Sequence, residues 1–265
     1  MLPRQGIHKM QEGKLKQLNF YGHCFNVVDS EMFKEGLELI KKSLFDKGAT
    51  FYASDNIITW NRNYSFARQP FYLELLQNTK THKIEKSIIW RTYILLYLAK
   101  FASHSMGDFV ELGCHTGHTA HQVLKTIDLH KFNKKYYLYD LFEWNPGDPH
   151  PQAYGHGNPD MYADVVNRFQ NFEAVQIIKG KVPDSFTKGF PEKISFCHID
   201  MNNSAPEIAA LNAVMPRLQS GGVVLLDDYG WWGYSAQKIG LDPIADTFGF
   251  EILELPTGQG VILKP

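Results

Sequence analysis

The chain has few cysteines, no cluster of positive charge and no long apolar run. Its three cysteines in 265 residues, Cys24, Cys114 and Cys197, form no CxxC pair. Such sparse usage argues against a disulfide framework and is typical of a reducing compartment. Lys and Arg number 27 against 28 Asp and Glu, which gives a formal net charge of −1. A protein that binds a polyanion needs clustered positive charge, so we expect no nucleic-acid partner.

No segment predicts a membrane span or a secretory leader. The most apolar run, residues 88–101, contains Arg91 and Lys100. It is also shorter than the roughly 20 apolar residues that a bilayer-spanning helix requires. Residues 1–11 are polar and lack the apolar core of a signal peptide. We therefore expect a cytoplasmic protein with no membrane partner.

The sequence divides into two regimes near residue 105. Apolar residues recur at helical steps of three and four in residues 33–44 and again in residues 88–98, and the segment between them predicts an ordered loop over 56–70. We interpret residues 1–105 as an N-terminal helical segment that serves as a cap or oligomerisation element. With Trp90, Tyr93 and Tyr97, it carries more apolar surface than one sheet edge can bury, which predicts a homodimer.

From residue 106 to 265, strands and helices alternate. Strands are predicted at 109–112, 136–139, 175–178, 194–199, 223–226, 251–255 and 260–264, and helices at 119–127, 161–169, 206–218 and 235–248. This alternation favours a parallel sheet with helices on both faces. The last two strands are joined by a hairpin-length connection, which can only pair antiparallel strands. The predicted fold class is α/β, a Rossmann-like class I methyltransferase fold with a mostly parallel seven-stranded sheet and a C-terminal antiparallel hairpin.

The first predicted strand of this alternating region ends in a glycine-containing turn that offers a ligand site. Glu111 precedes Gly113, and Thr116, Gly117 and Thr119 lead into the next helix. The glycines let the backbone approach a ligand, and the helix N-terminus offers unpaired N–H groups. The spacing is not the GxGxxG of a dinucleotide site, where Glu111 would repel a pyrophosphate. Glu111 could instead hold the α-amino group of an amino-acid-bearing ligand. A tight turn without a ligand is the alternative.

A second acid follows the next predicted strand. Asp140 lies 27 residues after Gly113, in the range where an acidic residue binds a ribose diol, with a helix cap as the alternative. Phe142, two residues further on, belongs to the same candidate cofactor site. The stretch at 143–157 is rich in Pro, Gly and His and predicts a lid or substrate-binding loop, with a disordered insertion as the alternative.

Three aspartates follow two further strands that we expect to be neighbours. Asp200 ends one of them, and Asp227 and Asp228 end the other, so their carboxylates should meet at the edge that carries the glycine turn. Three carboxylates with water suit Mg²⁺ or Mn²⁺. The alternative is that they cap helices and pair with lysines. His198 precedes Asp200 by two residues and so points to the same side of the strand, where we interpret it as a buried orienting residue rather than a ligand.

Together these residues resemble those of the macrocin O-methyltransferase family, which methylates sugars of macrolides and aminocoumarins. The resemblance runs from residue 56 to the end and is carried by Trp90-Arg91 and by residues 107–113, 138–142, 178–186, 216–222, 227–230, 233–237 and 255–260. It implies a class I methyltransferase fold, S-adenosylmethionine as donor, and Mg²⁺ held by Asp200, Asp227 and Asp228.

One position departs from that family. Similar enzymes carry a second acid two residues after the first metal aspartate, and that acid is read as the general base. Here the position is Asn202, and an amide cannot accept the proton. The candidate catalytic residues are therefore Asp200, Asn202, Asp228 and His198.

The expected function is S-adenosylmethionine-dependent, Mg²⁺-assisted O-methylation of a hydroxyl on a small molecule, a sugar or glycosylated metabolite. Two alternatives stay open. Asn202 favours a catalytically inactive protein that binds S-adenosylmethionine. An NAD-dependent oxidoreductase is disfavoured by the missing GxGxxG and by the closing hairpin.

Overall fold

The structure is a computed structural model that describes residues 19–44, 50–143 and 158–265. Residues 1–11, and all but the first residue of the loop expected at 143–157, lie outside these ranges. The chain forms two compact units, Met1–Ile88 and Ile89–Pro265. The division comes earlier than the expected residue 105, because helix α4 (Ile89–Ala102) packs against strands of the second unit.

The first unit contains a small sheet, so the expectation that residues 1–105 are helical was wrong for this part. Its elements are β1 (Asn19–Tyr21), α1 (Ser30–Ser43), β2 (Phe51–Ser54), β3 (Ile57–Trp60), η1 (Ser65–Arg68), α2 (Pro70–Gln77) and α3 (Lys83–Ser87). β2 pairs in parallel with β1 and antiparallel with β3. Asp55 and Asn56 join β2 to β3 with φ of 53° and 57°, which suits a tight hairpin turn. All four residues of β2 are buried, so the strand shows no alternation in sequence.

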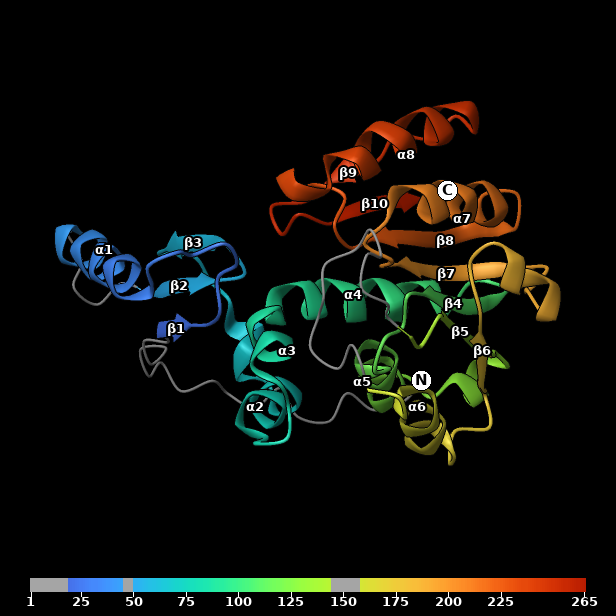
Figure 1. Ribbon diagram of the computed structural model, residues 1–265, viewed down its shortest axis with the longest axis horizontal. Coiled ribbons are helices and arrows are strands. Elements are labelled where there is room, and N and C mark those ends of the chain that lie inside the picture. Colours follow the sequence, from blue (N-terminus) through green and yellow to red (C-terminus); the bar gives the residue numbers. More distant parts are fainter. Residues whose placement is uncertain (1–18, 45–49, 144–157) are drawn as a thin grey trace, which may run out of the picture. The chain divides into compact units, whose positions relative to one another are not determined.

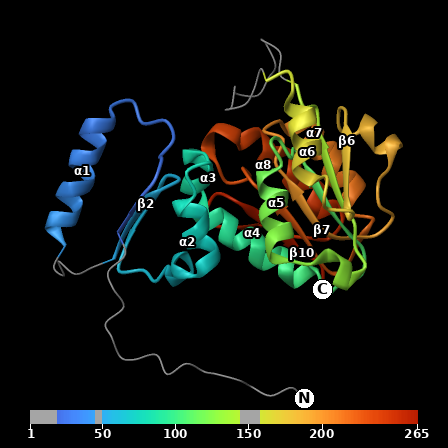
Figure 2. The ribbon, with the colours of Figure 1, turned by 90° about the horizontal axis from the view of Figure 1, so that it is seen from below.

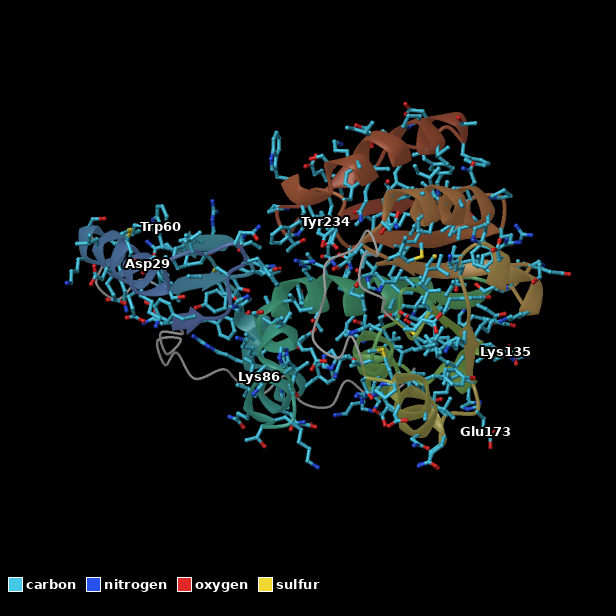
Figure 3. All side chains as sticks on the ribbon, in the orientation of Figure 1. Asp29, Trp60, Lys86, Lys135, Glu173 and Tyr234 are labelled. Carbon is cyan, nitrogen blue, oxygen red and sulfur yellow. The ribbon has the colours of Figure 1, made fainter. Side chains whose placement is uncertain are left out.

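Helix α1 begins at a polar cap and packs on this sheet through few residues. The carboxylate Oδ1 of Asp29, labelled in Figure 3, accepts hydrogen bonds from the backbone N–H groups of Glu31 and Met32 at 3.0 and 2.9 Å. Leu37 joins Phe51 in a small core. The Asp29 cap thus fixes where α1 begins, and Leu37 attaches the helix to the sheet.

The second unit is built on a seven-stranded sheet with the order β6-β5-β4-β7-β8-β10-β9 (Figure 1). Its strands are β4 (Asp108–Leu112), β5 (Tyr136–Asp140), β6 (Val175–Lys179), β7 (Ile194–Ile199), β8 (Leu218–Leu226), β9 (Leu253–Glu254) and β10 (Gly260–Leu263). β4 to β8 are parallel, and β10 is antiparallel to both β8 and β9. This confirms the expected α/β fold class and its closing hairpin.

Helices cover both faces of this sheet (Figure 2). They are α4, α5 (His118–Thr126), α6 (Met161–Phe169), α7 (Ser204–Val214) and α8 (Ser235–Thr247), with short 3₁₀ turns η2 (Leu129–Phe132), η3 (Asp184–Lys188) and η4 (Trp232–Tyr234). Cys197 and Ile199 of β7 join the core that includes Leu211 of α7 and Leu241 of α8. Because side chains alternate along a strand, His198 points to the opposite face, where Arg91 of α4 lies.

The sheet order places the candidate site. β4 lies between β5 and β7, and the chain turns in opposite directions from it, which makes the carboxyl end of β4 a topological switch point. The glycine turn follows β4, Asp140 ends β5, and Asp200 follows β7. All three therefore lie at one edge of the sheet. None of the helices in the described ranges has the length and apolar character that a bilayer crossing needs.

Candidate active site

The turn after β4 requires glycine because the end of β4 lies in close contact with the backbone that follows β7. Gly113 has φ of 90°, and a Cβ at this position would lie 1.8 Å from the carbonyl oxygen of Asp200. The backbone N–H of Gly113 donates to Tyr139 at 2.8 Å, and that of Asp200 donates to Leu112 at 2.8 Å. Any side chain at 113 would therefore push the end of β7 away from the end of β4.

The same turn leads into α5 through Gly117. This residue has φ of 72° and caps the helix, and a Cβ here would lie 2.5 Å from the Phe169 ring. Thr116 and Thr119 are half-buried on either side of it. The N–H groups at the start of α5 thus open toward the carboxyl edge of the sheet, as a ligand-binding turn requires.

Asp140 braces this turn from the neighbouring strand. Its Oδ2 accepts from the backbone N–H of His115, and its Oδ1 from that of Phe142, both at 2.7 Å. Phe142 has φ of 54°, and its buried ring packs against Tyr162 with centroids 5.2 Å apart. Each carboxylate oxygen keeps a second lone pair, so the fixed carboxylate can still accept from a ligand hydroxyl.

Glu111 is directed into the sheet rather than into the turn. Its Oε2 accepts from the hydroxyl of Tyr136 at 2.8 Å, and its Oε1 lies 3.5 Å from Nδ1 of His198. The side chain is 2% exposed. The structure thus engages both carboxylate oxygens with protein groups, and the expected contact with a ligand amino group stays a prediction.

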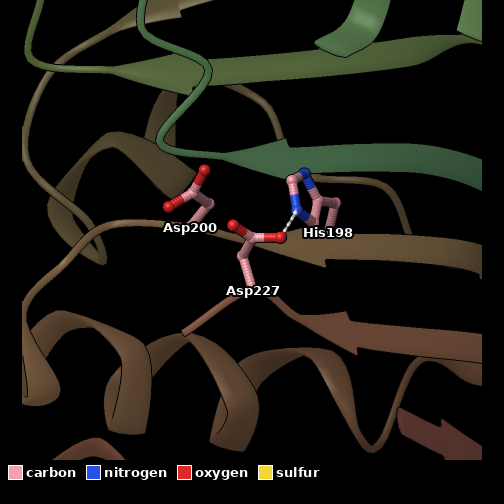
Figure 4. A group of neighbouring side chains, drawn as sticks. All are labelled: His198, Asp200 and Asp227. Atoms are coloured by element: carbon pink, nitrogen blue, oxygen red, sulfur yellow. Dashed lines mark ion pairs between the residues drawn. The ribbon is translucent and has the colours of Figure 1, made fainter. Parts of the chain in front are cut away.

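A cluster of acids lies beside the glycine turn (Figure 4). Ligand atoms of His198, Asp200 and Asp227 lie within 4.8 Å of one another. Nε2 of His198 is 3.7 Å from Oδ1 of Asp227, an ion-pair separation that is too long for a hydrogen bond. Burial disfavours the charged imidazolium, but the flanking carboxylates of Asp227 and Glu111 raise the pKa of His198 to about 10. The two carboxylates thus favour the protonated form of the imidazole.

Asp200 is the acid of this cluster whose surroundings favour its protonated form. Burial raises the pKa of its carboxyl well above the usual range, and the neighbouring carboxylates of Asp227 and Asp228 raise it further. Asn202, with φ of 53°, donates its amide to Oδ1 of Asp200 at 3.4 Å. This crowding of carboxylates is what a bound cation would offset.

Arg91 neutralises the other two aspartates. Its Nη1 donates to Oδ2 of Asp227 at 2.7 Å and to Oδ1 of Asp228 at 3.2 Å, and its guanidinium lies 4.9 Å from the centre of the Trp231 ring. Burial favours the protonated form of Asp227, but Arg91 and His198 hold the pKa of this carboxyl below its usual range. Arg91 had no predicted role. Its signal in the sequence is a charge inside an apolar helix, which implies a buried partner.

Further residues around the cluster carry no strong sequence signal. The amide of Gln259, fully buried in the closing hairpin, donates to Oδ1 of Asp227 at 3.0 Å and accepts from the hydroxyl of Thr257. Glu207 of α7 accepts from the backbone N–H of Met201 at 3.1 Å. It therefore holds the loop after Asp200.

Tyr234, labelled in Figure 3, interacts electrostatically with two of the same acids, Asp228 and Asp200. Burial raises the pKa of its hydroxyl to about 12, with Asp228 and Asp200 adding to the effect. The interactions of Gln259, Glu207 and Tyr234 with the cluster join segments that are far apart in the chain, so local sequence patterns do not predict them.

The donor set fits a hard divalent cation only in part. Carboxylate oxygens are the ligands that Mg²⁺ and Mn²⁺ take, and Asp200 and Asp227 already converge. Within the described residues, Asp228 does not join this converging group, and its Oδ1 instead accepts from Arg91. The residues present therefore fit such a cation once the Asp228 side chain turns toward Asp200.

Comparison with known proteins agrees with this fold. Residues 110–229 match a family described as a methyltransferase domain, a segment that runs from β4 through the glycine turn to the last acids of the cluster. No curated protein sequence matches the chain.

Solved structures resemble it at low sequence identity. The O-methyltransferase NovP is 17% identical, with a TM-score of 0.56 over 66% of this chain and 80% of its own. CalS11, a TDP-rhamnose 3′-O-methyltransferase of calicheamicin biosynthesis, is 14% identical, with a TM-score of 0.51 over 75% of this chain and 93% of its own. A second structure of CalS11 gives a TM-score of 0.53 at 14% identity, over 75% of this chain and 91% of its own.

The domain match covers the glycine turn, Asp140 and the three aspartates, and the sheet order with its closing hairpin is that of the class I methyltransferase fold. Residues 110–229 thus match a methyltransferase domain, and this match together with the fold supports an S-adenosylmethionine-dependent methyltransferase.

Proposed function

We propose that this enzyme methylates a hydroxyl oxygen of a small molecule, with a sugar or glycosylated metabolite as the acceptor and Mg²⁺ or Mn²⁺ at the acidic cluster. The observation that carries this proposal is the contact between the donor turn and the cluster, where Gly113 lies directly against Asp200. A methyl donor at the turn and a hydroxyl at the acids would then be neighbours. The names of the two similar structures, both O-methyltransferases and one acting on a sugar nucleotide, point to the same acceptor class.

In this proposal the glycine turn and Asp140 hold the donor. Asp140 accepts from the ribose hydroxyls, while the backbone of Gly113 and Gly117 leaves room for the amino-acid end. Phe142 packs against the adenosine portion. The oxygens of Glu111 are held by Tyr136 and His198, so Glu111 does not hydrogen-bond the donor. Its negative charge attracts the donor's amino group from below the turn.

Asp200, Asp227 and Asp228 would hold the cation. Bound there, a divalent ion lowers the pKa of an acceptor hydroxyl, and the donor supplies an electrophilic methyl group on its sulfonium. Asn202 orients the acceptor with its amide, which already points at Asp200. Glu111 and Asp227 flank His198 and favour its protonated form, so His198 is not the base in this proposal. The acceptor proton therefore leaves to solvent or to Asp228.

A product-mass screen tests this proposal. The purified protein is incubated with S-adenosylmethionine carrying a labelled methyl group, with Mg²⁺, and with panels of glycosides, nucleotide sugars and phenols. We expect label in a glycoside or nucleotide sugar and none with Asp200→Asn, with Asp242→Asn as the matched aspartate control outside the cluster. Donor binding without transfer to any hydroxylated acceptor would contradict the proposal and favour the non-catalytic alternative.

A further inference from the structure

We propose that Arg91 and the divalent cation are alternative partners of Asp228, so that the cation binds by displacing this arginine from the acidic cluster. The inference rests on the proposed function, because it concerns the cation assigned there. Beyond that function, the inference assigns Arg91 the role of a competitor for Asp228, and this competition would raise the metal concentration that the enzyme requires.

The direction of the Asp228 carboxylate is the first observation. Asp200 and Asp227 place ligand oxygens within 4.8 Å of each other, whereas Asp228 does not join them within the described ranges. Its Oδ1 lies 3.2 Å from Nη1 of Arg91. For Asp228 to become a third ligand with Asp200 and Asp227, its side chain has to turn, and this contact is lost.

Sharing of one nitrogen is the second observation. Oδ2 of Asp227 and Oδ1 of Asp228 both accept from the same Nη1, at 2.7 and 3.2 Å. A divalent ion ligated by these two oxygens, at the roughly 2.0–2.1 Å that Mg²⁺ requires, would lie close to that nitrogen. Two positive charges at such a separation repel strongly in a site of low polarity.

The third observation is the contact between Arg91 and the Trp231 ring, which gives the displaced guanidinium a partner. Arg91 lies 4.9 Å from the centre of the Trp231 ring, which can hold a cation on its face. The Arg91 side chain is 8% exposed, so a buried arginine without an anionic partner would be costly. In the metal-free protein, Arg91 therefore stabilises the two aspartates, and Trp231 helps to retain it when they turn to the metal.

The main test measures Mn²⁺ binding by calorimetry, without turnover. Arg91→Met removes the competitor, so Mn²⁺ should bind at least roughly tenfold more tightly than to the wild type. Arg217→Met is the matched control, because Arg217 also lies over an aromatic ring, Phe190, but outside the cluster. Equal or weaker binding in Arg91→Met would overturn the inference, because it would mean that Arg91 organises the ligands instead of competing with the ion.

A second measurement uses the folded wild type, in case Arg91→Met does not fold. Mg²⁺, which does not itself quench tryptophan, should change the fluorescence of Trp231 by moving Arg91 on its ring, and the change should be absent in Trp231→Phe. Mg²⁺ binding by calorimetry with no such difference would overturn the inference and leave the proposed metal site intact. Absence of Mn²⁺ binding in the wild type and in every folded variant would overturn both, so the two failures are distinguishable.

Discussion

The imidazole of His198 lies 3.5 Å from the carboxylate of Glu111, and both side chains are 2% exposed. The ring reaches Asp227 on its other side, at 3.7 Å. The strand that leads into the glycine turn is thus joined to the acidic cluster by a row of alternating buried charges. Such a row holds the two halves of the site in one arrangement, because removing any member leaves a buried charge without its partner.

Replacement of Asp140 should weaken donor binding. Asp140→Ala removes a charge-assisted contact to the ribose, and we expect a loss of about 1.5–3 kcal/mol in affinity for S-adenosylmethionine by calorimetry. Asp140→Asn keeps one acceptor oxygen and should lose less. Asp108→Ala is the control, since Asp108 also accepts a backbone N–H, from Lys135, but at the opposite end of β4. Unchanged affinity in both Asp140 variants would refute the donor site.

Removal of metal should abolish methyl transfer. With a chelator present we expect loss of activity, and Mg²⁺ or Mn²⁺ should restore it, while donor affinity changes little because the cation serves the acceptor. Asp200→Asn should not be restored by added metal. Full activity of the wild type in excess EDTA would assign the three aspartates to structural roles or to direct acceptor binding.

The amide of Asn202 should contribute to the rate. Asn202→Ala is expected to lower kcat about tenfold to a hundredfold by losing the group that orients the acceptor. Alanine also strains this backbone, because Asn202 has φ of 53°. Asn202→Gly relieves the strain and serves as the control. A glycine variant with wild-type rate would show that the amide has no catalytic role.

Glu207 should make stability depend on pH. Burial raises the pKa of its carboxyl from 4.5 to about 8, aided by Asp228 and opposed by the N–H groups of Met201 and Asn203. Between these values the folded protein binds a proton that the unfolded chain has lost, so stability falls as pH rises through this window. Glu207→Gln keeps an acceptor oxygen and has no proton to lose.

The thermal midpoint of Glu207→Gln, relative to wild type, should therefore increase from pH 5 to pH 8.5. Glu251→Gln, at an exposed position, is the control and should show no such trend. A constant difference between Glu207→Gln and wild type across this range would show that Glu207 is charged throughout.

The exposed face of α4 should mediate a homodimer. Tyr97 and Phe101, one helical turn apart, are 65% and 54% exposed. We expect a dimer by light scattering at micromolar concentration, and a monomer for the double variant Tyr97→Glu with Phe101→Glu. Ile239→Glu is the control, because Ile239 is an exposed apolar residue on a different helix, α8, and this variant should stay dimeric. A monomeric wild type would refute this assembly and, with it, the oligomerisation role proposed for residues 1–105.

Hydrophobic periodicity and the turn residues between the elements were sufficient to predict the α/β sheet and its closing hairpin. Each strand of the second unit is a short apolar run next to a helical repeat, and parallel strands all direct their carboxyl ends to one edge. Gly113, Asp140, Asp200 and the Asp227–Asp228 pair each follow such a strand. Their meeting at one edge is therefore a consequence of topology that the sequence already contains.

Sequence periodicity failed to predict a strand where both of its faces are buried, because such a strand has no alternation of apolar and polar residues. β2 is buried at every position, so it shows no period-two alternation, and its hairpin signal is confined to Asp55 and Asn56. The helical periodicity on either side therefore dominated the interpretation of residues 1–105. Helix α4 was predicted as a helix, but its membership of the second unit depends on packing against β7 and β8, which no local pattern records.

The strand pattern was enough to predict that the glycine turn and the aspartates share one edge of the sheet, whereas the pairing of their charges depends on tertiary packing. Glu111 precedes a glycine turn in the sequence, yet it is bound to Tyr136 and His198. Arg91 reaches Asp227 across 136 positions of chain. Strand order brings backbones together through local periodicity, whereas a buried ion pair forms between whichever opposite charges packing leaves side by side, because each would otherwise be desolvated alone.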